Sequence, residues 1–283
     1  MICQVNDLAI YYEVYGEGTP ILMLHGFYPD HRSMKGCLEP IFVKRPGWKR
    51  VYLDLPGMGQ TKGQSWLDSS DRMLKVVLEF VEQVIPHQSF LIVGDSYGAY
   101  LARGIVYKQA ERVDGICLVC PCIVADSKKR TVLPHRTLVR NQELLSSLSA
   151  DEANEFESIA VVQNRRNWER VRDEIFSGVQ LADSEFLERL RANGYTFSFP
   201  VDLLEKPFEK PTLILTGRQD ATVGYHDAWG ILEHYPRATY AVLDAAGHVL
   251  QIEQERLFEE LVCEWLQRIK AEKENAYIGQ PAT

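Results

Sequence analysis

The sequence has no long hydrophobic run. No stretch of its 283 residues reaches the ~18 consecutive apolar residues that a membrane-spanning helix requires. The first residues, from Met1 to Asp7, also lack the basic region followed by an apolar stretch that marks a secretory leader. We therefore expect a protein that does not enter the membrane, and a cytoplasmic location is the simplest prediction.

Cysteine is scarce and poorly arranged for disulfides or for a metal. Six cysteines in a chain of this length do not form the disulfide framework that holds small secreted domains together. The tightest pair, Cys120 and Cys122, has C-x-C spacing, and no second Cys or His pair lies nearby in the sequence to complete a zinc site. The sequence thus predicts buried free thiols, with no metal and no organic cofactor.

Positive charge is also in deficit. The chain carries 31 basic and 39 acidic residues, which gives a formal net charge of −8. Binding to nucleic acid or to an anionic membrane surface requires a basic face, so we expect neither partner. One short basic run, Lys128-Lys129-Arg130, could meet an acidic substrate, but a solvated helix face is the simpler interpretation. The expected partner is a small-molecule substrate.

What the sequence does contain is an alternation of short apolar runs and helical patterns. Short apolar runs bounded by turn residues are typical of strands buried on both faces of a parallel sheet. Apolar residues at helical spacing predict a helix at 71–84, which Pro86 ends, and another at 257–269, which ends near Lys270 and Lys273. This alternation predicts an α/β fold with a mostly parallel central sheet and helices on both faces. The predicted strands are 8–15, 20–24, 50–53, 90–93, 115–119, 212–215 and 239–243.

The middle of the chain has a different pattern. Residues 124–205 are rich in charge, space apolar residues such as Trp168 and Leu190 along helices, and contain no strong strand pattern. We interpret this segment as a helical cap over one end of the sheet. The expected division is therefore a core built from 1–123 and 206–283, with a cap at 124–205.

The most specific motif is Gly94-Asp95-Ser96-Tyr97-Gly98, a G-x-S-x-G that follows a predicted strand and precedes a helical pattern. In this context the serine sits on a strained strand-to-helix turn, and the two flanking glycines are needed because side chains there would collide with neighbouring backbone. The turn lifts the hydroxyl clear of the sheet, and the helix N-terminus favours negative charge that develops beside it. Ser96 is thus the candidate nucleophile.

A serine hydroxyl needs a base, and the base needs a carboxylate to orient it. His248 is the best placed of the seven histidines, because it follows the last predicted strand and precedes the C-terminal helix. Its loop should meet the serine turn at the carboxyl edge of the sheet. Asp220, in the loop after the preceding strand, is the candidate acid. The rival carboxylates are Asp126, which is a stronger rival than Asp244, and Asp227.

A second turn, His25-Gly26-Phe27, follows the strand predicted at 20–24. Glycine at its centre lets the backbone approach a bound substrate closely. The backbone N–H of Phe27 can then join the N–H of Tyr97 as an oxyanion hole. His25 itself is interpreted as a hydrogen-bonded loop residue rather than a proton carrier.

Together these motifs resemble the α/β-hydrolase superfamily, over about residues 8–269. Met58 departs from the pattern, because many relatives carry His or another polar residue there. Relatives with an aspartate nucleophile, such as haloalkane dehalogenases and epoxide hydrolases, are excluded by the serine at position 96. The resemblance rests on His25-Gly26-Phe27, the loop 54–60, the motif 94–98, Gly217 to Asp220, and Gly247-His248.

The resemblance implies Ser96 as nucleophile, His248 as base and Asp220 as acid, with oxyanion donors at Phe27 and Tyr97. We therefore expect a serine hydrolase that cleaves a carboxylic ester or related acyl bond of a small, fairly apolar substrate through an acyl-enzyme. The natural substrate, its acyl length, the pocket residues and the oligomeric state are not fixed by the sequence.

Three alternatives stay open. The same scaffold could hydrolyse a C–C bond of a diketone or an N-terminal peptide bond, it could serve as a non-catalytic ligand receptor, or it could be an interaction protein with a degenerate site. A peptidase would need an acidic residue in the cap to bind the substrate amine. The candidates for that residue include Glu155, Glu157 and Glu174.

Overall fold

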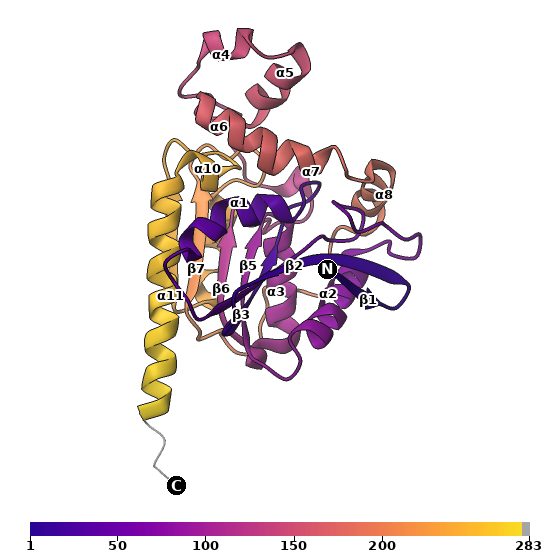
Figure 1. Ribbon diagram of the computed structural model, residues 1–283, viewed down its shortest axis with the longest axis vertical. Helices are drawn as coiled ribbons and strands as arrows, with labels where there is room; N and C mark the ends of the chain where they lie inside the picture. Colours follow the sequence, from indigo (N-terminus) through magenta and orange to yellow (C-terminus); the bar gives the residue numbers. More distant parts are fainter. Residues whose placement is uncertain (279–283) are drawn as a thin grey trace.

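The computed structural model describes residues 1–278, and its centre is one eight-stranded sheet (Figure 1). The strand order is β1-β2-β4-β3-β5-β6-β7-β8. β1 with β2 and β2 with β4 pair antiparallel, whereas all pairings from β4 onward to β8 are parallel. The predicted α/β fold with a mostly parallel sheet is confirmed. The strands are β1 (Ile2–Val5), β2 (Leu8–Tyr15), β3 (Thr19–Leu24), β4 (Trp48–Leu53), β5 (Phe90–Asp95), β6 (Val113–Val119), β7 (Thr212–Gly217) and β8 (Ala238–Leu243).

The central strands are buried on both faces, which explains their continuous apolar sequences. All residues of β5 and β7 are buried. β1 was not predicted from the sequence, because its four residues are too few to establish a period. β1 forms a hairpin with β2 through a turn in which Asn6 has a φ of 53°.

Four long helices cover the sheet. Gly115 of β6 packs against Ile269 of α11, whereas Gly94 of β5, which points to the opposite face, packs against α3. α1 was not predicted, because Gly36 and Pro40 interrupt its helical pattern. The predicted end of α11 near Lys270 and Lys273 is wrong: Lys270 and its charged neighbours are good helix formers, so the helix continues to Ile278. The helices are α1 (His31–Phe42), α2 (Ser70–Val84), α3 (Tyr97–Gln109) and α11 (Glu255–Ile278).

Residues 124–205, which we call the inserted segment, leave the sheet after β6 and return before β7. Figure 1 shows their helices gathered above the end of the sheet where the parallel strands terminate, next to the short helix α10 (Leu250–Glu253). The helices of the inserted segment are α4 (Gln142–Ser146), α5 (Ala150–Ile159), α6 (Arg165–Arg170), the π-helical turn η3 (Val171–Phe176), α7 (Ser177–Val179) and α8 (Ser184–Gly194).

The inserted segment has a small hydrophobic core of its own, separate from the main core around the sheet. Phe156 and Trp168 lie within it, with ring centroids 5.4 Å apart. Two of its members, Val249 and Ile252, come from the region of α10 that directly follows His248. The inserted segment is therefore packed onto the same stretch of chain that carries the candidate base. Within residues 1–278, no helix combines the length and apolar character needed to cross a bilayer.

Candidate active site

Ser96 occupies the turn between β5 and α3 and has a strained backbone. Its φ is 51° and its ψ is −109°, a combination that costs a non-glycine residue about 1–3 kcal/mol. A Cβ added to Gly94 would lie 2.6 Å from the carbonyl oxygen of Gly98, and one added to Gly98 would lie 2.1 Å from the carbonyl oxygen of Leu24. The turn can therefore close in this form only with glycine at both positions.

Replacing Gly98 with alanine should strain this turn severely. We expect Gly98→Ala to lower the free energy of unfolding by about 2–4 kcal/mol, because the new methyl group must displace the backbone of β3. Urea unfolding monitored by tryptophan fluorescence measures the change. Gly230→Ala is the control, since a Cβ there would have as its nearest neighbour the carbonyl oxygen of Asp227 at 3.3 Å. Equal stability of the two variants would contradict this account.

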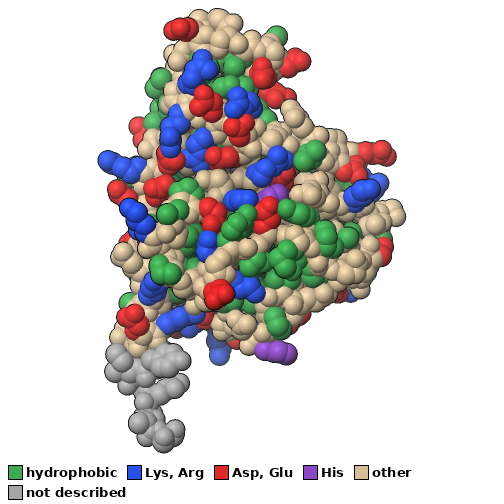
Figure 2. Space-filling model, viewed as in Figure 1, with side chains coloured by type: hydrophobic (Ala, Val, Ile, Leu, Met, Phe, Trp, Pro, Cys, Tyr) green, Lys and Arg blue, Asp and Glu red, His purple; other side chains and the backbone are tan. Residues whose placement is uncertain are grey.

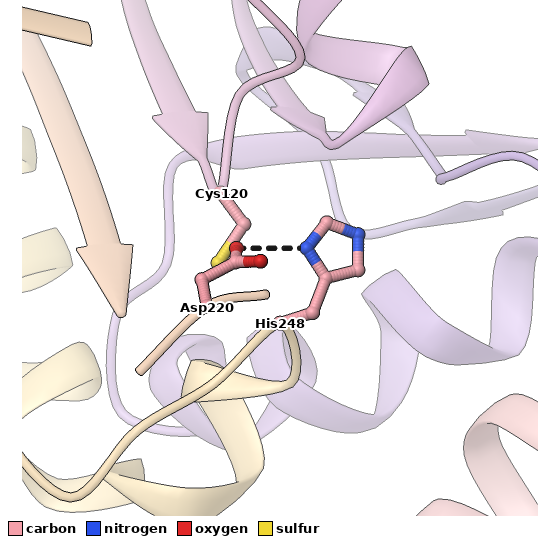
Figure 3. Close-up of side chains that lie close together, drawn as sticks. All are labelled: Cys120, Asp220 and His248. Carbon is pink, nitrogen blue, oxygen red and sulfur yellow. Dashed lines mark hydrogen bonds and ion pairs between the residues drawn. The ribbon is translucent and has the colours of Figure 1, made fainter. Parts of the chain in front are cut away.

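The structure brings Ser96, His248 and Asp220 together at the carboxyl edge of the sheet. The hydroxyl oxygen of Ser96 lies 3.0 Å from Nε2 of His248, and Nδ1 of His248 lies 2.9 Å from Oδ2 of Asp220. Figure 3 shows the carboxylate facing the imidazole. The second carboxylate oxygen accepts the backbone N–H groups of Thr222 at 2.8 Å and Val223 at 3.0 Å. These bonds fix the carboxylate, which in turn orients the imidazole toward Ser96.

The rival carboxylates bond to groups other than His248. Asp126 caps a short 3-10 helix by accepting a backbone N–H. Asp227 accepts a backbone N–H from the inserted segment, and Asp244 bonds a glutamine side chain. Of the four carboxylates weighed from the sequence, Asp220 is the one that contacts the imidazole.

Charge and burial tune the two ionisable members of this set. Burial alone would lower the pKa of His248, but the neighbouring Asp220 carboxylate outweighs burial and holds that pKa above its ordinary value. Burial also works to raise the pKa of Asp220, yet the imidazole and two backbone N–H groups hold it below its ordinary value. Asp220 therefore stays ionised and can stabilise positive charge that forms on His248.

The turn at 25–27 passes directly beside Ser96. A Cβ added to Gly26 would lie 3.4 Å from the Cβ of Ser96. The ring of Phe27 packs edge-on against the ring of Tyr97, with centroids 5.1 Å apart. The two residues predicted as oxyanion donors thus flank the serine.

His25 has the contacts expected of a structural residue. Its Nε2 accepts the backbone N–H of Leu55 at 2.9 Å, and its Nδ1 lies 2.7 Å from the carbonyl oxygen of Gly26. Complete burial lowers the pKa of His25 and keeps the imidazole neutral. The side chain ties the turn beside Ser96 to the loop that follows β4.

Asp95 is a buried carboxyl next to the serine, and no role was predicted for it. Its Oδ2 lies beside Gly26, where an added Cβ would be 3.1 Å away. Burial raises the pKa of Asp95 to about 7. Its Oδ1 has no hydrogen-bond partner among the described residues.

A cavity of about 770 Å³ opens over Ser96 and His248. This volume suits a small molecule, and most of the side chains that form its wall are apolar or aromatic. Apart from Phe27, these residues were not predicted from the sequence, because they come from loops and short helices that only the fold brings together. The apolar and aromatic part of the wall consists of Phe27, Tyr28, Pro29, Ala125, Ile159, Ile175, Phe176, Val179, Ala192, Tyr195 and Val249.

The cavity wall includes charged side chains of both signs, Asp126, Arg130 and Arg191. Figure 2 shows Lys and Arg side chains interspersed with Asp and Glu over the visible face of the molecule. Within the basic run 128–130, Lys128 and Lys129 are exposed, as a solvated face predicts. Arg130 instead turns inward and donates to the carbonyl oxygens of Val124 at 2.8 Å and Thr222 at 3.1 Å. Arg130 therefore ties the inserted segment to the loop of the candidate acid.

Among residues 1–278, two clusters contain side chains of the metal-ligating types. One joins Cys120 to Asp220 and His248, and Figure 3 shows the sulfur beside the carboxylate. Burial raises the pKa of Cys120 well above its ordinary value, and the thiol lies 3.6 Å from the carbonyl oxygen of Gly247. The other cluster is Asp30, His31 and Asp54, whose side chains bond one another or neighbouring groups. The side chains of both clusters form hydrogen bonds within the protein.

Comparison with known proteins identifies the family. The model of the alpha/beta hydrolase fold matches residues 19–255, and the chain belongs to this family. A solved structure, the alpha/beta superfamily hydrolase from Oenococcus oeni PSU-1, is 30% identical, with 92% of this chain and 96% of that chain covered and a TM-score of 0.85. The family membership expected from the motifs is confirmed.

Curated relatives at lower identity are hydrolases. A 2-hydroxy-6-oxononadienedioate/2-hydroxy-6-oxononatrienedioate hydrolase 2 of Pseudomonas putida is 25% identical over 92% of both chains. A pimeloyl-[acyl-carrier protein] methyl ester esterase of Nitrosomonas europaea is 25% identical over 85% of this chain and 92% of that protein. The two relatives act on different substrates, so the comparison does not select one for this chain.

Proposed function

We propose that this protein is a serine hydrolase that cleaves a carboxylic ester or related acyl bond of a small, fairly apolar substrate. The observation that carries the proposal is the hydrogen-bonded series from Ser96 through His248 to Asp220, placed beneath a cavity with apolar, aromatic and charged side chains in its wall. Fold alone does not fix function, so the proposal rests on this site. The inserted segment, residues 124–205, is proposed to act as the cap that shapes the cavity.

The reaction would proceed in two halves. In the first, Nε2 of His248 takes the hydroxyl proton of Ser96 while the serine oxygen attacks the substrate carbonyl carbon. The backbone N–H groups of Phe27 and Tyr97 would bind the resulting oxyanion, and each such donor lowers the barrier by about 3 kcal/mol. The ester C–O bond then breaks, and the leaving alkoxide takes the proton from the imidazolium of His248.

In the second half, water hydrolyses the acyl-enzyme. His248 removes a proton from the water as its oxygen attacks the acyl carbon. The tetrahedral intermediate collapses to the carboxylic acid, and Ser96 regains the proton from His248. Asp220 keeps the imidazole in the tautomer that leaves Nε2 free to accept a proton in both halves.

The pKa of His248 predicts how the activity depends on pH. The base must be neutral to accept the proton of Ser96, and the Asp220 carboxylate holds the pKa of His248 above the ordinary value of about 6.5. We therefore expect kcat/KM to be full at alkaline pH and to fall as the pH drops through a value above 6.5. Initial rates on a p-nitrophenyl ester from pH 5 to 9 measure this fall, which is the acid limb of the pH profile. A midpoint of the acid limb below pH 6 would contradict the assignment of His248 as the base.

A C–C bond hydrolase is the second candidate. One observation favours it, namely that the named substrate of the Pseudomonas putida relative is an oxo-dienedioate without an ester group. For an aminopeptidase, the acidic residues weighed from the sequence give little support. Glu174 pairs with Arg170, Glu157 pairs with Arg140, and neither of these glutamates lines the cavity.

The test is a substrate panel combined with active-site labelling. We expect a fluorophosphonate probe to label the wild-type protein. The turnover of p-nitrophenyl esters should pass through a maximum as the acyl chain lengthens, at a length set by the cavity. Diketones and aminoacyl arylamides in the same assay distinguish the alternatives. Faster turnover of a diketone than of every ester would favour the C–C bond hydrolase, and absent labelling together with absent turnover would favour a ligand receptor.

A further inference from the structure

One partly buried carboxylate connects the inserted segment to the loop that carries His248. Glu253 is the last residue of α10. Its Oε1 accepts the backbone N–H groups of Val161 at 2.6 Å and Val162 at 2.9 Å, both in the inserted segment. Its Oε2 accepts the backbone N–H of Gly247 at 2.6 Å, directly before His248. One side chain thus satisfies three backbone donors from two separate parts of the chain.

Close packing accompanies these bonds. A Cβ added to Gly247 would lie 2.9 Å from a side-chain methyl group of Val161 and 3.3 Å from the carbonyl oxygen of Ile159. On the other side of His248, Val249 lies in the hydrophobic core of the inserted segment. The inserted segment therefore contacts the residues immediately before and immediately after the candidate base.

The same loop is held on its opposite side by the core. The side-chain oxygen of Gln219 accepts the backbone N–H of Ala246 at 3.2 Å, and the backbone N–H of Gln219 donates to the carbonyl oxygen of Ala246 at 2.9 Å. Gln219 directly precedes Asp220. The loop of His248 is thus fixed between the loop of the candidate acid and the inserted segment. Glu253 makes the hydrogen bonds on the side of the inserted segment.

We propose that Glu253 is a positioning residue. It couples the packing of the inserted segment against the core to the position of the His248 imidazole. The kinetic part of this inference rests on the proposed function, whereas the coupling itself does not. Removing a carboxylate from most of its water is costly unless its oxygens are bonded, and Glu253 is partly buried. Because the groups on both sides are N–H donors, only acceptor oxygens can bond to all of them. A carboxamide offers one acceptor oxygen and one NH2 group, so it must leave a donor on one side unpaired.

The first test is Glu253→Gln, studied at pH 8 because burial raises the pKa of Glu253 to about 7. We expect kcat on a p-nitrophenyl ester to fall about 10- to 100-fold, with little change in KM. The variant loses the hydrogen bonds of Glu253 on one side, so His248 is less well positioned. The rate of fluorophosphonate labelling should fall in parallel. A thermal unfolding transition confirms that the variant is folded.

Glu255→Gln is the matched control. Glu255 also joins the core to the inserted segment, since its carboxylate pairs with Arg166 and Arg170, but it is not bonded to Gly247. We expect this variant to keep kcat within about twofold of wild type, as partly exposed ion pairs contribute little. An equal loss of kcat in both variants would overturn the proposal, because general loosening of the inserted segment would then explain the effect.

Amide hydrogen exchange tests the coupling without relying on any activity. In Glu253→Gln, exchange should accelerate together in the peptides that contain 161–162 and 247, while peptides of β5 and β7 stay as protected as in wild type. Unchanged exchange in both peptides would overturn the inference even if the protein is an esterase. Faster exchange in a protein with no hydrolase activity would support the coupling and reject the proposed function. If Glu253→Gln does not fold, Gly247→Ala, which separates the same two surfaces sterically, should give the same pattern.

Discussion

Replacing Ser96 with alanine is expected to lower kcat/KM for p-nitrophenyl esters by about 10⁴- to 10⁶-fold, because the variant has no oxygen to form the acyl-enzyme. Alanine, like serine, has a Cβ, so the backbone strain at position 96 is the same in both proteins. The variant should therefore fold as the wild type does. Steady-state rates over the full ester panel, with the unfolding transition recorded for each sample, give the measurement.

Ser127→Ala is the matched control for Ser96→Ala. Ser127 also lines the cavity, but the hydroxyl bonded to the imidazole of His248 is that of Ser96. The control should keep kcat/KM within a few-fold of wild type. Turnover in Ser96→Ala comparable to that of Ser127→Ala would reject Ser96 as the nucleophile.

The second large effect is expected from Asp220→Asn, with a loss in kcat on the order of 10⁴-fold. The carboxamide removes the negative charge that faces Nδ1 of His248 at 2.9 Å, and it can hold the imidazole in the wrong tautomer. The pKa of His248 should also fall, because the Asp220 carboxylate is what raises it. The acid limb of kcat/KM should therefore move to lower pH in this variant, which a pH series of initial rates records.

Asp244→Asn tests the rival carboxylate that lies nearest to His248 in the sequence. Asp244 is exposed and bonds the side chain of Gln219 rather than His248. Its replacement should leave both kcat and the position of the acid limb close to those of wild type. If kcat falls as much in Asp244→Asn as in Asp220→Asn, Asp220 is wrongly assigned as the acid that orients His248.

Patterns that repeat over many residues made the fold predictable from the sequence. The apolar runs of β3, β5 and β7 report burial on both faces of a parallel sheet, and the structure has strands at each of them. Elements without such a pattern escaped detection. β1 has four residues, and α1 contains Gly36 and Pro40, so packing against the sheet rather than local sequence explains why each forms.

The site residues also divide into those that a sequence pattern predicts and those that only the fold brings together. Ser96, His248 and Asp220 could be proposed in advance because each stands just after a recognisable strand, and the carboxyl ends of parallel strands meet at one edge of the sheet. The cavity wall could not be predicted, since Phe176, Tyr195 and their neighbours meet only through the path of the inserted segment. Glu253 was missed because its contacts are to backbone groups, which leave no pattern in the sequence.

Mass spectrometry of the labelled protein tests the central claim most directly. Wild-type protein treated with a fluorophosphonate should gain one adduct per chain, peptide mapping should place it on Ser96, and His248→Ala should slow its formation by several orders of magnitude. If the protein hydrolyses esters while Ser96 remains unmodified, or if the adduct maps to another residue, the account of this site is wrong.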